Sequence, residues 1–170
     1  MKTYEIEKKY RLKDPKALRR KLRQLGARKK GDGREENEFW DFKGRLRRQR
    51  LTLRLRRYGA SEKLTLKGPR QRQSHGVEKR LELEMTVDFL TARAILRAAG
   101  FKPRLKYTKR RELYTVGKTE VTIDSLPKHG WFVEIEGALP AILSLEKKLG
   151  LAPADAEPQS YLALVLGKKR

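Results

Sequence analysis

Charged and apolar residues alternate one for one along several stretches of the chain. Residues 4–10 read YEIEKKY, so Glu5, Glu7 and Lys9 fall on every second position, with mostly apolar residues between them. Because successive side chains of a β-strand point to opposite faces, this spacing predicts a strand with one apolar and one charged face. The same pattern predicts further strands over residues 51–56, 63–67, 77–85, 109–115, 121–124 and 133–136.

Four other segments follow the helical period of about 3.6 residues. They cover residues 15–25, 88–99, 139–149 and the stretch from about 158 onward. Asp14 and Pro15 supply a cap and a first turn for the first of these helices, and Gly26, Gly100 and Gly150 end the first three. The turn-rich stretches 26–38 and 68–76 are interpreted as loops within a single domain that spans residues 1–170.

The composition adds a strong positive charge to this picture. Of the 170 residues, 43 are Lys or Arg and 21 are Asp or Glu, which gives a net charge of +22. Such a charge favours a polyanionic partner, and nucleic acid is the usual one. The sequence has no cysteine, which excludes disulfides and thiolate metal sites, and it has neither an apolar run of membrane-spanning length nor a signal peptide. We therefore expect a soluble, cytoplasmic protein that does not bind a membrane.

The charged strand faces decide the expected fold. An open sheet with one wet face explains any single strand, but acids repeat within strands, as EIE at 5–7 and 134–136 and as ELE at 82–84. Acids so close together repel one another unless cations lie between them, and LRLR, LTLK and KRR supply cations on other strands. A closed antiparallel barrel of the α+β class accounts for both observations. Its aliphatic faces would pack under the four helices, and its charged faces would line a tunnel.

Charges inside such a tunnel need partners, because burying an unpaired charge is costly. Divalent cations would satisfy the carboxylates, and an oligophosphate would satisfy the Lys and Arg side chains. Carboxylate, water and phosphate oxygens suit Mg²⁺ or Mn²⁺. The sequence therefore predicts a site for a metal ion and a chain of phosphates.

Seven motifs follow one another along nearly the whole chain. They are E-x-E-x-K at 5–9, N-x-F-x-D at 37–41, L-R-L-R at 53–56, L-T-L-K-G at 64–68, R-x-E-x-E at 80–84, K-x-R at 109–111 and an ending with Asp124, Gly130, Phe132, Glu134 and Glu136. This ordered series resembles the CYTH family, also called the triphosphate tunnel metalloenzymes. The family groups class IV adenylyl cyclases, thiamine triphosphatases and inorganic triphosphatases. The resemblance implies an eight-stranded barrel whose tunnel binds a triphosphate end-on.

The resemblance also implies roles for individual residues. The implied metal ligands are acidic: Glu5, Glu7, Glu84, Asp124, Glu134 and Glu136. The implied triphosphate-binding residues are basic: Lys9, Arg54, Arg56, Lys67, Arg80, Lys109 and Arg111. We expect one Mg²⁺ or Mn²⁺ to bridge the carboxylates and the triphosphate and a second to orient and acidify a water, whose proton Glu7 or Glu136 would accept. Lys168 is a further candidate, which would close the tunnel from the last helix.

Two positions depart from the family pattern. The family often has a glycine shortly before the L-R-L-R strand, where this chain has Arg50, and an apolar residue where this chain has His129. His129 and His75 lie in turn-rich segments and are interpreted as surface histidines. These departures bear on turn geometry and substrate choice more than on the fold.

Several activities remain open at this point. Hydrolysis of a triphosphate such as tripolyphosphate needs the fewest parts and is ranked first. A class IV adenylyl cyclase would also need an adenine pocket, for which Tyr107, Tyr114 and Trp131 are the aromatic candidates. A non-catalytic nucleic-acid or polyphosphate module would use basic charge alone, and the run RLRRQRLTLRLRR at 45–57 supports an outward basic patch. The protein is expected to be a monomer or a homodimer.

Overall fold

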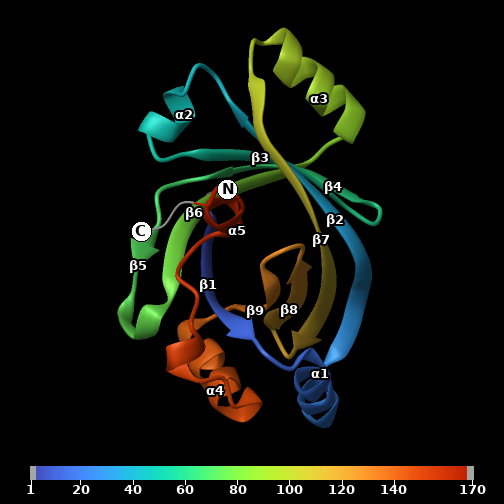
Figure 1. Ribbon diagram of the computed structural model, residues 1–170, viewed down its shortest axis with the longest axis vertical. Coiled ribbons are helices and arrows are strands. Elements are labelled where there is room, and N and C mark those ends of the chain that lie inside the picture. Colours follow the sequence, from blue (N-terminus) through green and yellow to red (C-terminus); the bar gives the residue numbers. More distant parts are fainter. Residues whose placement is uncertain (1–2, 168–170) are drawn as a thin grey trace. The chain divides into compact units, whose positions relative to one another are not determined.

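The structure is a computed structural model that describes residues 3–167 (Figure 1). Its strands are β1 (Thr3–Leu12), β2 (Arg28–Asp41), β3 (Thr52–Tyr58), β4 (Ser61–Lys67), β5 (Gln71–Arg72), β6 (Glu78–Thr86), β7 (Lys102–Val116), β8 (Thr119–Leu126) and β9 (Gly130–Glu136). Its helices are α1 (Pro15–Gln24), α2 (Arg45–Arg48), α3 (Phe89–Ala98), α4 (Leu139–Leu149) and α5 (Tyr161–Val165), and η1 (Ser74–Gly76) and η2 (Pro153–Asp155) are 3₁₀ turns.

The nine strands found within residues 3–167 belong to one sheet. Their order is β1–β9–β8–β7–β2–β3–β4–β6–β5, and β1 also pairs with β6. Eight strands therefore close into an antiparallel barrel, and only the two-residue β5 lies outside the closed set. The predicted fold class, an α+β protein with a closed eight-stranded antiparallel barrel, is confirmed.

The described residues group into two compact units, each assembled from separated stretches of the chain. The first unit holds residues 3–5, 34–71 and 79–108, and the second unit holds residues 6–33, 72–78 and 109–167. Each unit has its own hydrophobic core. The single domain expected for residues 1–170 stays a prediction.

In the first unit, α3 covers β3 and β4 (Figure 1). The helix begins after Asp88, whose side chain accepts a hydrogen bond from Thr91 N at 2.7 Å. This cap satisfies one of the N–H groups that a helix leaves open at its start. Phe89 and Leu96 of α3 then pack with the fully buried Leu55 of β3. The apolar face of these strands is thereby covered by a helix, as the alternation predicts.

In the second unit, α1 and α4 lie side by side (Figure 1). Asp14 caps α1 by accepting a hydrogen bond from Ala17 N at 2.9 Å. Leu22 of α1 and Ile142 of α4 share one buried cluster with Ile123 of β8. Full burial of an aliphatic side chain contributes about 1.5–3 kcal/mol. These contacts hold both helices on the apolar face of the strands.

The loop expected over residues 26–38 is wrong for most of that segment, which belongs to β2. Apolar alternation does not mark this strand, because its first residues are exposed and polar and because Glu35 and Asn37 are buried later in it. Residues 35–40 pair with β3, in which Asn37 lies opposite Arg56, and β7 is the other neighbour of β2 in the sheet. The sequence pattern of a single segment does not predict which residues of another strand will pair with it.

Two smaller differences concern short elements. The one-turn helix α2 is not predicted, because four residues are too few to show a helical period. Within residues 68–76, expected to be a loop, β5 and η1 are the regular elements. No helix in residues 3–167 has both the length and the apolar character that a membrane span requires.

Candidate functional site

The charged faces of β1, β7, β8 and β9 meet in the second unit. Lys9 of β1 lies opposite Glu134 of β9, and Arg111 of β7 lies opposite Asp124 of β8. The alternate residues of the same strands, such as Ile123, are fully buried in the core of this unit. These strands therefore have one charged and one apolar face, as the sequence predicts.

Asp124 is the centre of this charged face and is fully buried. Its carboxylate accepts hydrogen bonds from Lys109 Nζ at 2.9 Å, from Arg111 Nε at 2.7 Å and Nη2 at 2.6 Å, and from the Tyr161 hydroxyl at 2.8 Å. Forked bonds between a guanidinium and a carboxylate are among the strongest in proteins, and they also fix orientation. Asp124 thus positions Arg111 and Lys109 relative to each other.

Glu134 extends this arrangement to β1. Its carboxylate accepts a hydrogen bond from Arg111 Nη2 at 2.7 Å and lies 3.2 Å from Lys9 Nζ. Burial favours the neutral carboxyl, but the charges of Lys9, Lys109 and Arg111 outweigh burial and hold the pKa of Glu134 well below its usual range. Glu134 is therefore ionised at neutral pH. We call Lys9, Lys109, Arg111, Asp124, Glu134 and Tyr161 the Asp124 cluster.

Tyr161, the first residue of α5, is a member of this cluster that sequence reasoning missed. Burial and the neighbouring charge of Asp124 raise the pKa of Tyr161 well above its ordinary value, so its hydroxyl stays protonated and donates. The ammonium groups of Lys9 and Lys109 each lie 4.2 Å from the centre of the Tyr161 ring, where the face of an aromatic ring attracts cations. The sequence places Tyr161 only on the apolar side of a helix, and nothing in it signals this contact.

Three oriented cations gather in the Asp124 cluster. Lys9, Lys109 and Arg111 face the carboxylates of Asp124 and Glu134. Guanidinium and ammonium groups held in fixed positions are suitable donors for phosphate oxygens. The cluster therefore has the side-chain chemistry of an anion site.

In the first unit, Lys67 of β4 lies between two carboxylates. Its ammonium donates to Glu5 at 2.7 Å and 2.6 Å and lies 3.1 Å from Glu82 Oε2. Lys67 was expected to bind phosphate and Glu5 to bind metal, and the structure joins them in an ion pair. Both side chains are largely buried, so this pair differs from the weak pairs of an exposed surface.

Glu84 of β6 forms a second group in the first unit. It accepts hydrogen bonds from Thr65 Oγ1 at 2.9 Å and from Lys63 Nζ, and it lies 3.7 Å from Arg56 Nη2. Arg56 also lies 3.8 Å from Glu35 Oε2. Burial opposes the charge of Glu84, but the bonds from Lys63 and Thr65 prevail and lower its pKa. Arg56 is thus shared by two carboxylates.

Arg54 and Arg80 complete the basic residues expected in the first unit. Arg54 Nε is buried and has no hydrogen-bond partner among residues 3–167. Burial opposes its charge, but Glu35 and then Tyr107 raise the pKa of Arg54, so it stays cationic. Arg80 donates through Nη2 to the carbonyl of Gly68 at 3.0 Å. Arg54 therefore offers a buried donor to an anion, whereas part of Arg80 holds the end of β4.

Three acidic positions run across adjacent strands of the second unit. Glu7 of β1 lies opposite Glu136 of β9, and Glu136 in turn lies opposite Glu120 of β8. Sequence reasoning missed Glu120, although its two-residue spacing from Thr122 and Asp124 assigns it to the same face. Carboxylate oxygens are ligands that Mg²⁺ and Mn²⁺ prefer, so these positions fit the expected metal.

Within residues 3–167, no three acidic or histidine side chains gather closely enough to hold a metal ion by themselves. The other implied metal ligands are bonded to Lys or Arg side chains: Glu5, Glu84, Asp124 and Glu134. Their metal-binding role stays a prediction, and Lys168 lies outside the described residues.

Two buried ion pairs lie on the helix side of the strands, where only apolar residues were expected. Lys8 of β1 donates to Glu146 of α4 at 2.8 Å, and Arg19 of α1 donates to Glu112 of β7 at 2.6 Å. The Tyr114 hydroxyl also donates to Glu112, at 2.7 Å. The sequence signal is that Lys8 and Glu112 interrupt the alternation at apolar positions. These pairs tie α4 and α1 to the sheet.

Glu112→Gln is expected to flatten the acid side of the stability–pH profile. Burial favours the neutral carboxyl, but hydrogen bonds from Arg19 and Tyr114 hold the pKa of Glu112 below its ordinary value. Such a group stabilises the fold above its unfolded-state pKa, about 4.3, and this contribution is lost as the pH falls through the lower folded-state pKa. Urea unfolding at a series of pH values from about 7 to 2 measures this loss.

The control for this prediction is Glu120→Gln, which removes the same charge from an exposed position on the neighbouring strand. That variant should keep the acid slope of the wild-type protein. An unchanged slope in Glu112→Gln would show that the buried pair adds nothing to acid sensitivity.

Fold and charged clusters together define a class of protein: a closed β-barrel whose strand faces carry cations and carboxylates in ordered contact. Residues 3–161 match the family model of the CYTH domain. The chain belongs to the CYTH domain family. Members of this family are metal-dependent adenylyl cyclases or triphosphatases and bind triphosphate substrates such as ATP.

Individual relatives span nearly the whole chain. It is 29% identical over 175 residues to adenylate cyclase CyaB of Aeromonas hydrophila, covering 95% of this chain and 88% of the relative. A solved structure from Vibrio parahaemolyticus has a TM-score of 0.86 at 22% identity and covers 96% of this chain and 98% of that one. The HpAC1 protein from Hippeastrum has a TM-score of 0.71 at 20% identity and covers 98% and 97%.

Proposed function

We propose that this protein is a metal-dependent hydrolase of triphosphates, with inorganic tripolyphosphate or an organic triphosphate as substrate. The observation that carries the proposal is the Asp124 cluster, in which three oriented cations face two carboxylates. A triphosphate offers several oxygens that can accept hydrogen bonds from these oriented cations. The Arg111 fork matches the geometry of phosphate oxygens, and the ammonium groups of Lys9 and Lys109 act as point charges.

We further propose that four basic residues of the first unit bind phosphate oxygens: Arg54, Arg56, Lys67 and Arg80. Glu5 orients the ammonium of Lys67, and Arg56 lies between Glu35 and Glu84. Oriented cations suit phosphoryl transfer, which depends on positioning and charge neutralisation more than on a strong nucleophile. Substitution of one of these residues is therefore expected to slow hydrolysis.

Glu7 and Glu136 are the residues proposed to hold the metal, with Glu120 beside them on the same face. When bound, Mg²⁺ or Mn²⁺ neutralises phosphate charge and makes a water more acidic. Glu7 or Glu136 accepts the proton of the attacking water. Tyr161 takes no part in the chemistry, and its hydroxyl holds Asp124, which in turn orients Arg111.

Adenylyl cyclase activity is the second candidate, and the relative named adenylate cyclase CyaB favours it. The aromatic residues considered for an adenine pocket have partners within the chain. Tyr107 stacks on Phe39 with ring centres 5.7 Å apart, Tyr114 bonds to Glu112, and Trp131 lies under Arg19. This favours hydrolysis, and the Hippeastrum protein of the same fold is described by a dominant triphosphatase activity.

Product analysis separates the candidates. The purified protein is incubated with tripolyphosphate, ATP and thiamine triphosphate, with Mg²⁺, with Mn²⁺ and with a chelator. We expect metal-dependent conversion of tripolyphosphate and water to pyrophosphate and phosphate. Cyclic AMP and pyrophosphate from ATP as the main products would instead establish the cyclase. Tight triphosphate binding without turnover in any metal would overturn the proposal in favour of a binding module.

A further inference from the structure

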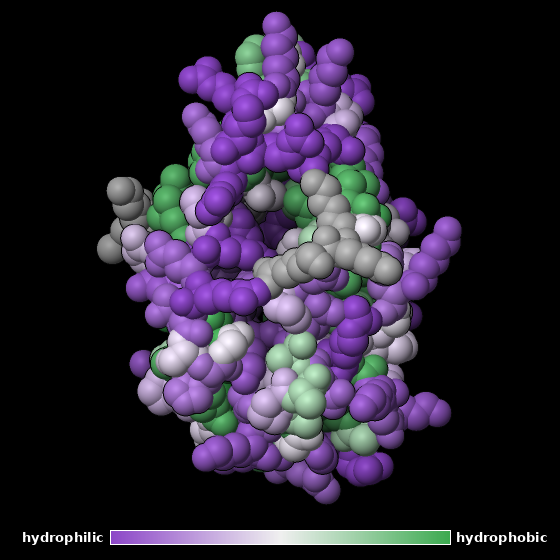
Figure 2. Space-filling model, turned by 60° about the vertical axis from the view of Figure 1, so that its left-hand side comes forward, coloured by the Kyte–Doolittle hydropathy of each residue, from purple (hydrophilic) through white to green (hydrophobic). Residues whose placement is uncertain are grey.

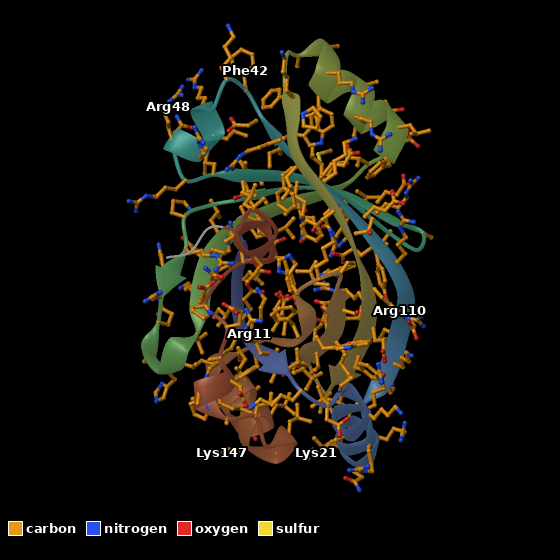
Figure 3. All side chains as sticks on the ribbon, in the orientation of Figure 1. Arg11, Lys21, Phe42, Arg48, Arg110 and Lys147 are labelled. Atoms are coloured by element: carbon orange, nitrogen blue, oxygen red, sulfur yellow. The ribbon has the colours of Figure 1, made fainter. Side chains whose placement is uncertain are left out.

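The short helix α2 and its flanking turns carry a dense group of exposed cations. Five of the eight residues from 43 to 50 are basic, and we call them the α2 patch: Lys43, Arg45, Arg47, Arg48 and Arg50. All five are exposed. Figure 3 marks Arg48 beside α2, and Figure 2 shows hydrophilic residues over most of the upper part of one face of the molecule. The α2 patch belongs to neither of the charged clusters described above.

None of these five cations forms an ion pair with any residue from 3 to 167. Other exposed arginines of the first unit do so: Arg57 lies 3.0 Å from Glu36, and Arg93 lies 2.9 Å from Glu38. The acid nearest to the α2 patch in sequence is Asp41, and its carboxylate accepts a hydrogen bond from Leu46 N instead. The positive charge of the α2 patch is therefore not neutralised locally.

Two cations of the α2 patch occupy positions whose left-handed backbone conformation favours glycine. Lys43 and Arg50 have φ values of +48° and +56°, in the left-handed region that is costly for residues with a Cβ atom. Arg50 follows the C-terminus of α2, where Arg50 N bonds to Arg47 O and Leu51 N bonds to Leu46 O. This bonding pattern usually places glycine in the position of Arg50. A cation retained here at a cost in stability indicates a use for its charge.

From these observations we infer that the α2 patch binds single-stranded nucleic acid through its phosphate backbone. Exposed cations that form no ion pair attract phosphates, and their binding releases the counterions of the nucleic acid. Four of the five are arginines, whose guanidinium groups fork onto phosphate oxygens and also stack on unpaired bases. Inorganic polyphosphate offers no base to stack on, so arginine-rich composition favours nucleic acid. This binding is separate from the proposed triphosphate chemistry and does not depend on it.

Fluorescence anisotropy with a labelled oligouridine of about 20 nucleotides tests the inference. The test variant is Arg45→Gln/Arg47→Gln/Arg48→Gln. The matched control, Lys16→Gln/Arg20→Gln/Arg23→Gln, removes the same charge from three exposed positions of α1 that also lack ion pairs within the described chain. Far-UV circular dichroism and thermal unfolding verify that both variants are folded.

The patch variant is expected to bind about tenfold or more weakly at low salt, and its salt-dependence slope should fall by about 2. The control should stay within about threefold of the wild-type affinity, because its three cations lie on α1 and not in the α2 patch that contacts the phosphates. Equal losses in both variants would show that binding follows net charge, and no loss in the patch variant would exclude the α2 patch. Polyphosphate that competes better per phosphate than oligouridine would reassign the surface to polyphosphate.

The substitution Arg50→Gly is an independent test of nucleic-acid binding by the α2 patch. Relief of the left-handed backbone is expected to raise the melting temperature by about 2–4 °C, while loss of the guanidinium weakens oligouridine binding. A stabilised variant that binds RNA as tightly as the wild-type protein would contradict the role assigned to this cation. A higher melting temperature together with weaker oligouridine binding is expected only if Arg50 lowers stability and contributes to binding.

Discussion

Arg111→Ala is expected to lower kcat/KM for tripolyphosphate hydrolysis by about 100-fold or more, the range found when one donor that stabilises developing charge is removed. Arg111 is the residue that joins Asp124 to Glu134, through bonds of 2.6–2.7 Å. Its guanidinium is held in place before substrate arrives, so its removal costs both charge and orientation. Steady-state kinetics with phosphate detection measures the effect.

Arg110→Ala is the matched control for this prediction. Arg110 is adjacent in sequence but on the opposite face of β7, where it is 65% exposed and bonds to Asp32 at 3.0 Å (Figure 3). Its loss should leave kcat/KM within about twofold of wild type, because exposed pairs contribute little. Arg111→Lys separates charge from geometry, since lysine keeps the charge and loses the fork. Equal losses in Arg110→Ala and Arg111→Ala would contradict the assignment of the charged face.

Asp124→Ala is expected to cause the largest loss of stability among substitutions in the Asp124 cluster, about 3–5 kcal/mol. The carboxylate is fully buried, and its removal takes one counter-charge from the ammonium of Lys109, 2% exposed, and from the guanidinium of Arg111, 12% exposed. The Tyr161 hydroxyl also loses its acceptor. Breaking one side of a buried pair is costly because the remaining charge stays away from water.

Urea unfolding of Asp124→Ala measures this loss, with Asp32→Ala as the control. Asp32 also binds two cations, Lys29 at 2.7 Å and Arg110 at 3.0 Å, but these are 44% and 65% exposed. Its removal should cost only about 0–1 kcal/mol. Similar losses for the two variants would show that burial does not strengthen the Asp124 cluster.

The fold was predictable from sequence because period-two alternation marks each strand that has one apolar face. The alternation in β1, β8 and β9 fixes which side chains share a face, so Lys9, Asp124 and Glu134 could be assigned to one surface before any coordinates. β2 was not predictable, because its polar residues include buried ones such as Glu35 that owe their place to cross-strand partners.

The site was predictable only in part, because several residues that contact one another in it are far apart in the sequence. Motif spacing locates residues within one strand, but Tyr161 reaches Asp124 across 37 positions and Lys8 reaches Glu146 across 138. In the sequence, Tyr161 looks like an ordinary core residue, and Lys8 interrupts the apolar face of its strand without indicating which residue it contacts. Only the packing of α5 and α4 on the strands reveals them as partners of buried charges.

The contact between Lys9 Nζ and the carbonyl of Gln159, at 3.1 Å, spans 150 positions of the chain and has a consequence for synthesis in the cell. At about 5–20 residues per second, a ribosome adds the second residue of this pair about 8–30 s after the first. During that interval the ammonium of Lys9 cannot contact the carbonyl of Gln159 or the ring of Tyr161, because these residues have not yet been synthesised. The proposed anion site is therefore expected to form late, and nascent chains halted before α5 should be unable to retain triphosphate.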